Sequence, residues 1–350
     1  MNDHAWMGVA LDVAARGLGR TAPNPTVGAV VVRDGVVLAE GWTQPPGSDH
    51  AETHALRQIE GCAAGATVYV VLEPCCHHGR TPPCTDALIR AGVARVVVGT
   101  VDPFPLVAGQ GIARLREAGI VVDVGIREEE CRRLNRGFLR AVTLGLPEVT
   151  LKAAVSLDGR IASSRGESKW ITGPAARDLG HRLRDTHDAV LVGVSTVLAD
   201  NPTLTTRVSG GRDAVPVVLD STLRTPSGAA LLTAGRPPIL YTTVAPRPMG
   251  AALVVQVPAG PGGVDLGAVL RDLAARGLHR ILAEGGGSVH RSLLEGGYAD
   301  RMELFVNGRV LAGGPGFVGG AGFSLPDAPA FRFVHGAPVG EDFHLVLERV

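Results

Sequence analysis

Short apolar runs alternate with amphipathic segments along most of the chain. Runs rich in valine, such as residues 66–73 and 95–101, predict buried strands, because β-branched side chains pack well in sheets. Segments with apolar positions three and four apart, such as residues 111–118, predict helices. Strands that alternate with helices are typical of α/β folds, and the first half therefore predicts a three-layer α/β unit.

The first half of the chain ends at a glycine and proline break. Its predicted strands are residues 29–32, 36–42, 66–73, 95–101 and 121–125, and its predicted helices are one within residues 1–19 and residues 52–59, 85–91, 111–118 and 128–142. The sequence Arg33-Asp34-Gly35 predicts a hairpin turn between the first two strands. The break at Gly145-Leu146-Pro147 predicts one domain over residues 1–146 and a second over residues 147–350.

The second half begins again with a strand. Its predicted strands are residues 149–156, 189–194, 215–219, 239–242, 253–257, 280–283, a strand near Leu304 and 344–348, and its predicted helices are residues 174–187, 265–276 and 289–294. A length of 350 residues fits two domains. The two halves share no internal repeat, so we expect two different α/β domains.

Composition excludes some classes of function. The formal net charge is zero and aromatic residues make up 4% of the chain, which argues against a nucleic-acid-binding protein. No apolar run approaches the roughly 20 residues that span a bilayer, and no targeting segment is visible. Five cysteines, three of them clustered, fit a reducing cytoplasm and one metal site. We therefore expect a cytoplasmic protein without a membrane or nucleic-acid partner.

A cluster of histidine, glutamate and cysteine carries the candidate chemistry of the first half. His50-Ala51-Glu52 followed by Pro74-Cys75 and by Cys84 resembles the H-x-E and P-C-x-x-C signature of zinc deaminases, with the second cysteine delayed by an inserted loop. Three ligands, His50, Cys75 and Cys84, leave the fourth zinc position to water. Zinc lowers the pKa of that water, and Glu52 can carry a proton from the water to the leaving nitrogen.

Two other interpretations of the cluster stay open. A closed structural zinc site would take a fourth ligand from Cys76, His77 or His78, but this interpretation leaves Glu52 without a purpose. A disulfide between the two ligand cysteines is less favoured, because nothing else in the chain indicates secretion.

Two further segments have both a structural and a functional interpretation. Asn24 lies between two prolines, where it either makes a turn or presents an amide to the edge of a heterocycle. Gly285-Gly286-Gly287 lies between a predicted strand and a predicted helix, as in a pyrophosphate-binding turn. The run lacks the G-x-G-x-x-G spacing, and a tight turn explains it equally well.

Several longer motifs together resemble one enzyme family. They are residues 50–52, 73–75, 77–84 (HHGRTPPC), 107–109, 156–160 (SLDGR), 166–172 (GESKWIT) and 197–202 (VLADNP). In this order and spacing they resemble the bifunctional riboflavin biosynthesis enzymes. In that family a diaminohydroxyphosphoribosylaminopyrimidine deaminase is fused to a 5-amino-6-(5-phosphoribosylamino)uracil reductase. The resemblance implies a cytidine-deaminase-like N-terminal domain and a dihydrofolate-reductase-like C-terminal domain.

The resemblance also implies two consecutive reactions on a phosphorylated pyrimidine. The first hydrolyses an amino group to ammonia at one zinc ion per chain. The second uses NADPH to reduce the ribosyl chain to ribityl. The family further implies a homo-oligomer, a dimer or tetramer, and the preference for NADPH over NADH rests on the resemblance alone.

Matching positions assign roles residue by residue. By resemblance, His50, Cys75 and Cys84 bind zinc, Glu52 shuttles the proton, and Asn24, His77 and Arg80 contact the first substrate. The cofactor positions are Ala154, Trp170, Thr196, Asp200, Ser221, Gly286, Gly287 and Ser288. The positions for the second substrate are Lys152, Ser168, Arg184, Leu204, Arg207 and Glu284, of which the two arginines suit a phosphate.

Three positions depart from the family pattern. Thr43 stands where histidine is common, Phe104 interrupts the usual Asp-Pro-Asn-Pro, and Asn307-Gly308-Arg309 replaces Ala-Pro-Lys. These departures leave open a paralogue with one degenerate domain that acts on another pyrimidine or purine. A nucleic-acid editor is the alternative from another class, and the neutral charge argues against it.

Overall fold

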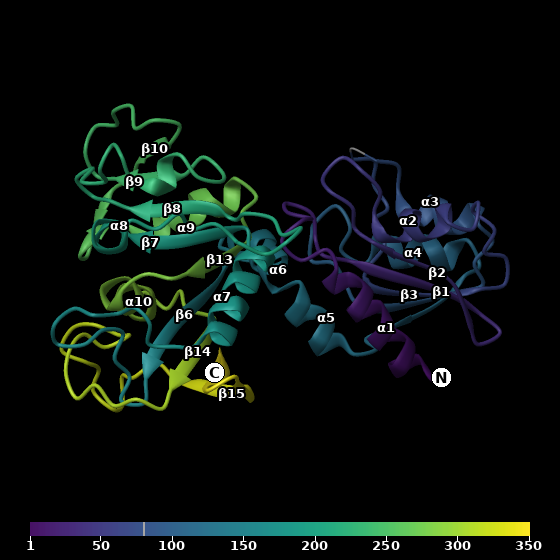
Figure 1. Ribbon diagram of the computed structural model, residues 1–350. Coiled ribbons are helices and arrows are strands. Elements are labelled where there is room, and N and C mark those ends of the chain that lie inside the picture. Colours follow the sequence, from purple (N-terminus) through teal and green to yellow (C-terminus); the bar gives the residue numbers. More distant parts are fainter. Residues whose placement is uncertain (80) are drawn as a thin grey trace. The chain divides into compact units, whose positions relative to one another are not determined.

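The computed structural model describes residues 1–79 and 81–350, which form two compact units. The first unit is Met1–Leu146 and the second is Pro147–Val350. In Figure 1 the first unit runs from purple to blue, and the second from teal through green to yellow.

The first unit is built on a mixed sheet. Its described residues form five strands in the order β2-β1-β3-β4-β5, with β1 antiparallel to both neighbours and β3, β4 and β5 parallel. The strands are β1 Gly28–Arg33, β2 Val36–Trp42, β3 Thr67–Leu72, β4 Arg95–Thr100 and β5 Val121–Val124. Because β3 and β4 are adjacent and parallel, the loops that follow them leave the same edge of the sheet.

Helices cover both faces of this sheet. They are α1 Asp3–Ala15, α2 Ala51–Arg57, α3 Cys84–Arg90, α4 Gln110–Glu117, α5 Glu128–Leu134 and α6 Arg136–Leu144. A Cβ at Gly28 would lie 2.1 Å from the Ala10 carbonyl oxygen on α1, and one at Gly41 would lie 2.2 Å from the Ala51 carbonyl oxygen on α2. Gly41 pairs with Ala29, the neighbour of Gly28, so α1 and α2 lie on opposite faces. The predicted three-layer arrangement is confirmed.

The helix predicted at residues 128–142 is two helices in the structure. The chain turns at Asn135, which is buried and lies between α5 and α6. Its Oδ1 atom accepts a hydrogen bond from the Thr26 N–H at 2.8 Å. The break therefore serves a contact more than 100 residues away, which local periodicity could not indicate.

The second unit is built on a larger sheet. Among the described residues nine strands take the order β10-β9-β8-β7-β13-β6-β14-β16-β15, parallel from β10 to β14 and antiparallel at β16 and β15. They are β6 Glu148–Ser156, β7 Ala189–Gly193, β8 Val215–Leu219, β9 Ile239–Thr242, β10 Leu253–Gln256, β13 Arg280–Ala283, β14 Arg301–Asn307, β15 Phe331–Val339 and β16 Asp342–Arg349. A small hairpin pairs β11 Ala259–Gly260 with β12 Gly263–Val264.

Helices connect the parallel strands of this sheet. They are α7 Pro174–Thr186, α8 Val194–Asp200, the 3-10 helix η1 Ala230–Leu232, α9 Leu266–Ala275 and α10 Gly287–Glu295. Figure 1 shows α7 in front of the sheet, and it packs on the face that carries Lys152: a Cβ at Gly180 would lie 3.4 Å from Lys152 Nζ. The sequence patterns missed α8 and β15. β15 is the edge strand and is largely exposed, so it lacks the alternation of a half-buried strand.

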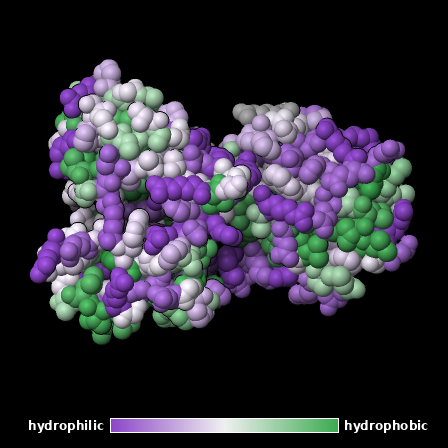
Figure 2. Space-filling model, in the orientation of Figure 1, coloured by the Kyte–Doolittle hydropathy of each residue, from purple (hydrophilic) through white to green (hydrophobic). Residues whose placement is uncertain are grey.

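The surface carries no single dominant feature in the view of Figure 2. Hydrophilic residues are spread over both units there, with hydrophobic patches between them. Within the described part of the chain, no helix combines the length and the apolar character that a membrane crossing needs.

Candidate active sites

Three side chains converge at the carboxyl edge of the first sheet. The ligand atoms of His50, Cys75 and Cys84 all lie within 4.8 Å of one another. The Nδ1 atom of His50 is 3.5 Å from the Cys75 sulfur and 3.4 Å from the Cys84 sulfur. One imidazole and two thiolates are a donor set that fits zinc and leaves a coordination position for water.

Two helix N-termini and one strand position the three ligands. His50 is the N-cap of α2, Cys84 is the first residue of α3, and Cys75 follows the end of β3. The Cys84 N–H donates to the Cys75 sulfur at 3.3 Å. Hydrogen bonds from Cys84, together with His50, hold the pKa of the Cys75 thiol well below its ordinary value. A thiolate is the form that binds a metal.

Glu52 lies in the first turn of α2, beside the ligand cluster, and is 3% exposed. Burial raises the pKa of Glu52 to about 7, and the negative charge of Cys75 adds to the shift. A carboxyl group with a pKa near neutrality can both accept and donate a proton, as general acid–base catalysis requires.

Glu73 anchors the segment that follows the adjacent strand β4, a role that the sequence patterns did not reveal. Its Oε2 accepts from the N–H groups of Asp102 at 3.2 Å and Gly109 at 2.9 Å, and its Oε1 accepts from Ile112 at 3.1 Å. Glu73 is buried at the end of β3, two residues before Cys75. Its place beside Pro74-Cys75 in the sequence indicated that Glu73 lies near the site. The N–H groups that it binds, however, come after the next strand, β4.

The Pro-framed loop before β1 is held by several backbone contacts. The Asn24 N–H donates to the Thr21 carbonyl at 2.9 Å, which agrees with a turn. Thr43, one of the departures from the family pattern, is buried, and its hydroxyl accepts from the Val27 N–H at 3.2 Å. Thr43 thus fixes the end of the loop. The predicted substrate contact Arg80 lies outside the described residues.

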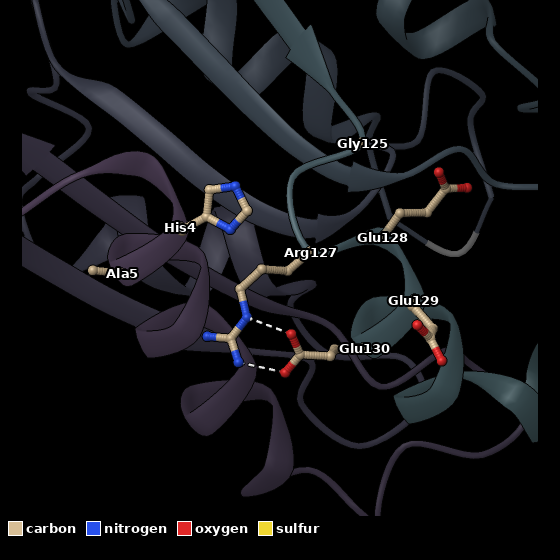
Figure 3. A pocket seen from close by; sticks show the side chains of 7 residues that line it. All are labelled: His4, Ala5, Gly125, Arg127, Glu128, Glu129 and Glu130. Carbon is tan, nitrogen blue, oxygen red and sulfur yellow. Dashed lines mark hydrogen bonds and ion pairs between the residues drawn. The ribbon is translucent and has the colours of Figure 1, made fainter.

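A pocket of the first unit contains none of the predicted site residues. It measures about 570 Å³ and is lined by His4, Ala5, Gly125, Arg127, Glu128, Glu129 and Glu130. Figure 3 shows the side chains of Arg127 and Glu130 pointing toward each other, and Arg127 Nε donates to Glu130 at 2.7 Å. The charges of this pair satisfy each other, and the pocket gives no reason to place a ligand there.

In the second unit, the predicted cofactor residues follow neighbouring strands at one edge. Ala154 is on β6, Gly286 and Gly287 follow β13, Thr196 follows β7, and Ser221 follows β8. The strand order β8-β7-β13-β6 therefore sets them in a row along the carboxyl ends of the parallel strands. This edge is where open α/β sheets bind dinucleotides.

The glycine run after β13 is needed for close packing. A Cβ at Gly287 would lie 2.6 Å from the Gly316 carbonyl oxygen, and one at Gly285 would lie 2.6 Å from Val289 Cβ. Gly286 is the N-cap of α10 in an extended conformation, and a Cβ there would reach only Thr196 Oγ1, at 4.0 Å. Gly286 thus leaves the start of α10 open on the side of Thr196.

Glu284 joins two of the predicted substrate residues. Arg184 donates to both of its oxygens, at 2.6 and 2.9 Å, and Lys152 Nζ lies 3.8 Å from Oε2. Burial opposes ionisation of Glu284, but the charges of Arg184 and Lys152 lower its pKa to about 2. The third donor of Arg184 bonds the Thr205 carbonyl at 2.8 Å.

This pairing distinguishes the two predicted phosphate partners. The Arg184 fork is committed to Glu284, whereas Arg207 is exposed and makes one long bond to Thr203 at 3.3 Å. Arg207 is therefore the better placed of the two for a substrate phosphate. Leu204 is 3% exposed and has a positive φ of 56°, so its side chain is buried.

Sequence reasoning missed His181, which belongs to this cluster. His181 lies on α7 three residues before Arg184, so the two share a helix face. Burial and the positive charges of Arg184 and Arg207 lower the pKa of His181. The three-residue spacing of His181 and Arg184 on a predicted helix was the feature of the sequence that could have identified His181.

Of the remaining predicted residues, Asp200 ends α8 and Ser288 lies in the first turn of α10, whereas Ser168 and Trp170 lie in the loop between β6 and α7. Trp170 is 60% exposed, with Arg177 4.5 Å from its ring centroid, and the Lys169–Trp170 peptide is cis. Arg309 donates to the Trp170 carbonyl at 3.0 Å, and Lys169 lies 3.5 Å from Asp200. Ser168 precedes this pair and is partly buried.

Asn307, the late departure from the family pattern, has a structural role. Its amide donates to Asp342 Oδ1 at 2.6 Å, and Asp342 Oδ2 accepts from the Gly173 N–H at 2.8 Å. Asn307 thereby links the end of β14 through β16 to the start of α7.

Comparisons with known proteins cover both units. Residues 1–100 match the family model for the cytidine and deoxycytidylate deaminase zinc-binding region, and residues 147–345 match the RibD C-terminal domain. The riboflavin biosynthesis protein RibD of Escherichia coli K12 is 40% identical over 99% of this chain and 100% of its own length. That of Bacillus amyloliquefaciens is 40% identical over 97% of this chain and 94% of its own. The chain belongs to the RibD family.

Solved structures of RibD proteins extend the similarity to the fold. A diaminohydroxyphosphoribosylaminopyrimidine deaminase/5-amino-6-(5-phosphoribosylamino)uracil reductase from Thermotoga maritima gives a TM-score of 0.90 at 37% identity, with 99% of both chains covered. RibD of Acinetobacter baumannii gives 0.89 at 37% identity, again over 99% of both chains.

RibD membership confirms the predicted fold class and the two predicted activities. The chain is a bifunctional enzyme of riboflavin biosynthesis, with a zinc-binding deaminase domain and a reductase domain. Because the match covers both units, a paralogue with one degenerate domain is not favoured.

Proposed function

We propose that the first unit deaminates 2,5-diamino-6-ribosylamino-4(3H)-pyrimidinone 5′-phosphate and that the second reduces the product with NADPH to 5-amino-6-ribitylamino-uracil 5′-phosphate. The observation that carries this proposal is the cluster of His50, Cys75 and Cys84, with ligand atoms within 4.8 Å and buried Glu52 beside it. The cluster belongs to a chain whose second unit matches the RibD reductase domain.

In the first reaction, the residues of unit 1 hold and protonate the substrate. His50, Cys75 and Cys84 would hold one zinc ion, which when bound makes water a nucleophile at neutral pH. Glu52 accepts the proton of that water and returns it to the departing amino nitrogen. Asn24, His77 and Arg80 would contact the pyrimidine nucleotide.

In the second reaction, the residues of unit 2 position the donor and the acceptor of the hydride. The row of Ser221, Thr196, Gly286, Gly287 and Ala154 would hold NADPH, aided by Trp170, Asp200 and Ser288. Arg207 and Lys152 would hold the ribosyl phosphate, and the Arg184–Glu284 pair, Ser168 and Leu204 would complete the substrate site. Such positioning accounts for most of the rate gain in a hydride transfer.

The finer properties of the enzyme belong to the same proposal. We expect one zinc ion per chain, NADPH rather than NADH as reductant, a homo-oligomer and a cytoplasmic location. Each unit has its own set of candidate site residues, which supports one activity in each unit. We place the domain boundary at Leu146–Pro147.

A two-stage assay tests the proposal. Protein of known zinc content receives the deaminase substrate and ammonia is followed; NADPH is then added and its absorbance is followed. We expect ammonia first and NADPH oxidation second, with Glu52→Gln abolishing ammonia release but not the oxidation of NADPH by pre-deaminated substrate. Glu60→Gln, an exposed glutamate just after α2, is the matched control. The absence of both ammonia release and NADPH oxidation in zinc-loaded protein would refute the proposal.

A further inference from the structure

Two loops meet beside the zinc ligand Cys75. Residues 74–79 and 81–84 follow β3 and carry two of the ligands, and residues 101–109 follow the adjacent parallel strand β4. Loops that leave neighbouring parallel strands at their carboxyl ends form the walls of ligand sites in α/β sheets. The second loop is therefore a wall of the deaminase site.

The position of this wall is fixed by several contacts. Glu73 accepts hydrogen bonds from both ends of the loop, Asp102 and Gly109. In the middle of the loop, the Leu106 carbonyl accepts a hydrogen bond from the Cys76 thiol at 3.6 Å. The loop is thus held against the segment that contains the zinc ligands.

Phe104 is the aromatic side chain of this wall. Its N–H donates to Asp102 Oδ1 at 2.8 Å, and its ring is partly exposed. The ring lies 5.9 Å from the His77 ring, centroid to centroid, with an angle of 51° between the planes. His77 Nδ1 is buried and has no hydrogen-bond partner among residues 1–79 and 81–350. His77 lies two residues beyond Cys75, so this aromatic pair lies close to a zinc ligand in the chain.

We propose that the ring of Phe104, supported by His77, packs against the pyrimidine ring of the deaminase substrate and makes Phe104 a specificity-determining residue. This inference rests on the proposed function of the first unit. A phenyl ring cannot hydrogen-bond to the edge of a heterocycle as the asparagine of the family pattern can. It contacts the face of the heterocycle instead, as aromatic side chains do with nucleobases.

Substrate binding without turnover tests this contact. The Kd of the deaminase substrate is measured by calorimetry in zinc-loaded Glu52→Gln protein. Three forms of this protein are compared: one with Phe104 unchanged, one with Phe104→Leu and one with Phe104→Trp. Loss of an aromatic–base stack typically weakens binding about tenfold, so we expect that increase in Kd for Phe104→Leu and recovery for Phe104→Trp. Leu106→Ala is the matched control, because it removes an exposed side chain from the same loop but keeps the carbonyl that Cys76 contacts.

Further outcomes distinguish failure of the Phe104 contact from failure of the proposed function. In the enzyme with Glu52 intact, the same Phe104→Leu change should raise the deaminase KM tenfold with kcat nearly unchanged and leave the reductase step unaffected. An unchanged Kd in Phe104→Leu, or a rise that follows loss of zinc from the protein, would overturn the inference and leave the proposed function standing. No binding of the substrate to Glu52→Gln protein at all would instead contradict the proposed function.

Discussion

At the scale of single residues, the most informative groups are those whose partners lie far away in the sequence. His50, Glu52 and Cys75 could be identified because they belong to two short motifs, H-x-E and P-C, whose residue types zinc deamination requires. The structural role of Glu73 and the pairing of Arg184 with Glu284 could not, because their partners lie about 30 and 100 residues away. A single sequence does not show which distant groups meet.

Glu73 gives the first prediction at this scale. Glu73→Gln replaces one acceptor oxygen with an NH₂ donor that faces backbone N–H groups, which leaves buried donors unpaired. We expect the free energy of unfolding of the first unit to fall by about 1–3 kcal/mol, with loss of ammonia release. Urea denaturation measures the change, and Glu117→Gln on the exposed side of α4 is the control. Equal stability of both variants would show that Glu73 does not hold the wall.

His187 gives a prediction of pH dependence. It is buried, its Nδ1 donates to the Leu183 carbonyl at 2.7 Å, and its Nε2 accepts from the Thr150 hydroxyl at 3.2 Å. Burial and the charge of Arg280 lower its pKa from 6.5 to about 3 in the folded protein. The unfolded chain therefore binds the proton first, so stability is complete above pH 6.5 and is lost as the pH falls toward 3.

A variant without this titration should respond less to acid. We expect His187→Gln to be less stable than the wild type at pH 7 but to lose less of that stability between pH 6.5 and 4. The difference in slope is at most about 1.4 kcal/mol per pH unit, the value for one proton. Urea denaturation of the second unit across this range checks it, and parallel slopes in the two proteins would contradict the assignment.

At the scale of elements, periodicity indicated the buried strands and failed where tertiary contacts decide. β3 and β4 are continuous apolar runs between helices on both faces, so their sequences identify them. β15 is an exposed edge strand, and α5 and α6 are separated by a buried contact of Asn135. Neither feature leaves a periodic signal.

The break between α5 and α6 can be tested directly. Asn135→Ala removes the acceptor of the Thr26 N–H, which is then buried without a partner. We expect a loss of about 1–3 kcal/mol in the free energy of unfolding of the first unit. Thermal or urea unfolding measures it, and Thr143→Ala, at an exposed position of α6, should change it by less than about 0.5 kcal/mol. A similar small change in both variants would mean that Asn135 is not needed for the turn.

At the scale of the whole molecule, each unit contains its own core and its own candidate site. The division at residues 146 and 147 follows a glycine and proline break that is visible in the sequence. The sequence did not reveal that the predicted cofactor positions form a row along the second sheet, because the strand order β8-β7-β13-β6 differs from the chain order. The resemblance to a family supplied those positions, and the topology explains why they can act together.

A change in the second unit should leave the first reaction intact. Glu284→Gln removes the negative charge that pairs Arg184 and Lys152, so both cations lose their shared partner. We expect kcat/KM of the reductase step to fall by at least about 100-fold, which corresponds to roughly 3 kcal/mol, with ammonia release unchanged. Steady-state kinetics of both steps on one preparation checks this, and a parallel loss of ammonia release would contradict independent sites.

The most direct test of the central claim is removal of zinc from the intact enzyme. A chelator-treated sample is divided, and ammonia release and NADPH oxidation by pre-deaminated substrate are measured before and after zinc is restored. The two-site account predicts that ammonia release is lost and recovered with zinc, while NADPH oxidation stays at the level of the untreated enzyme. Ammonia release that survives complete zinc removal, or NADPH oxidation that falls and recovers with it, would contradict the account.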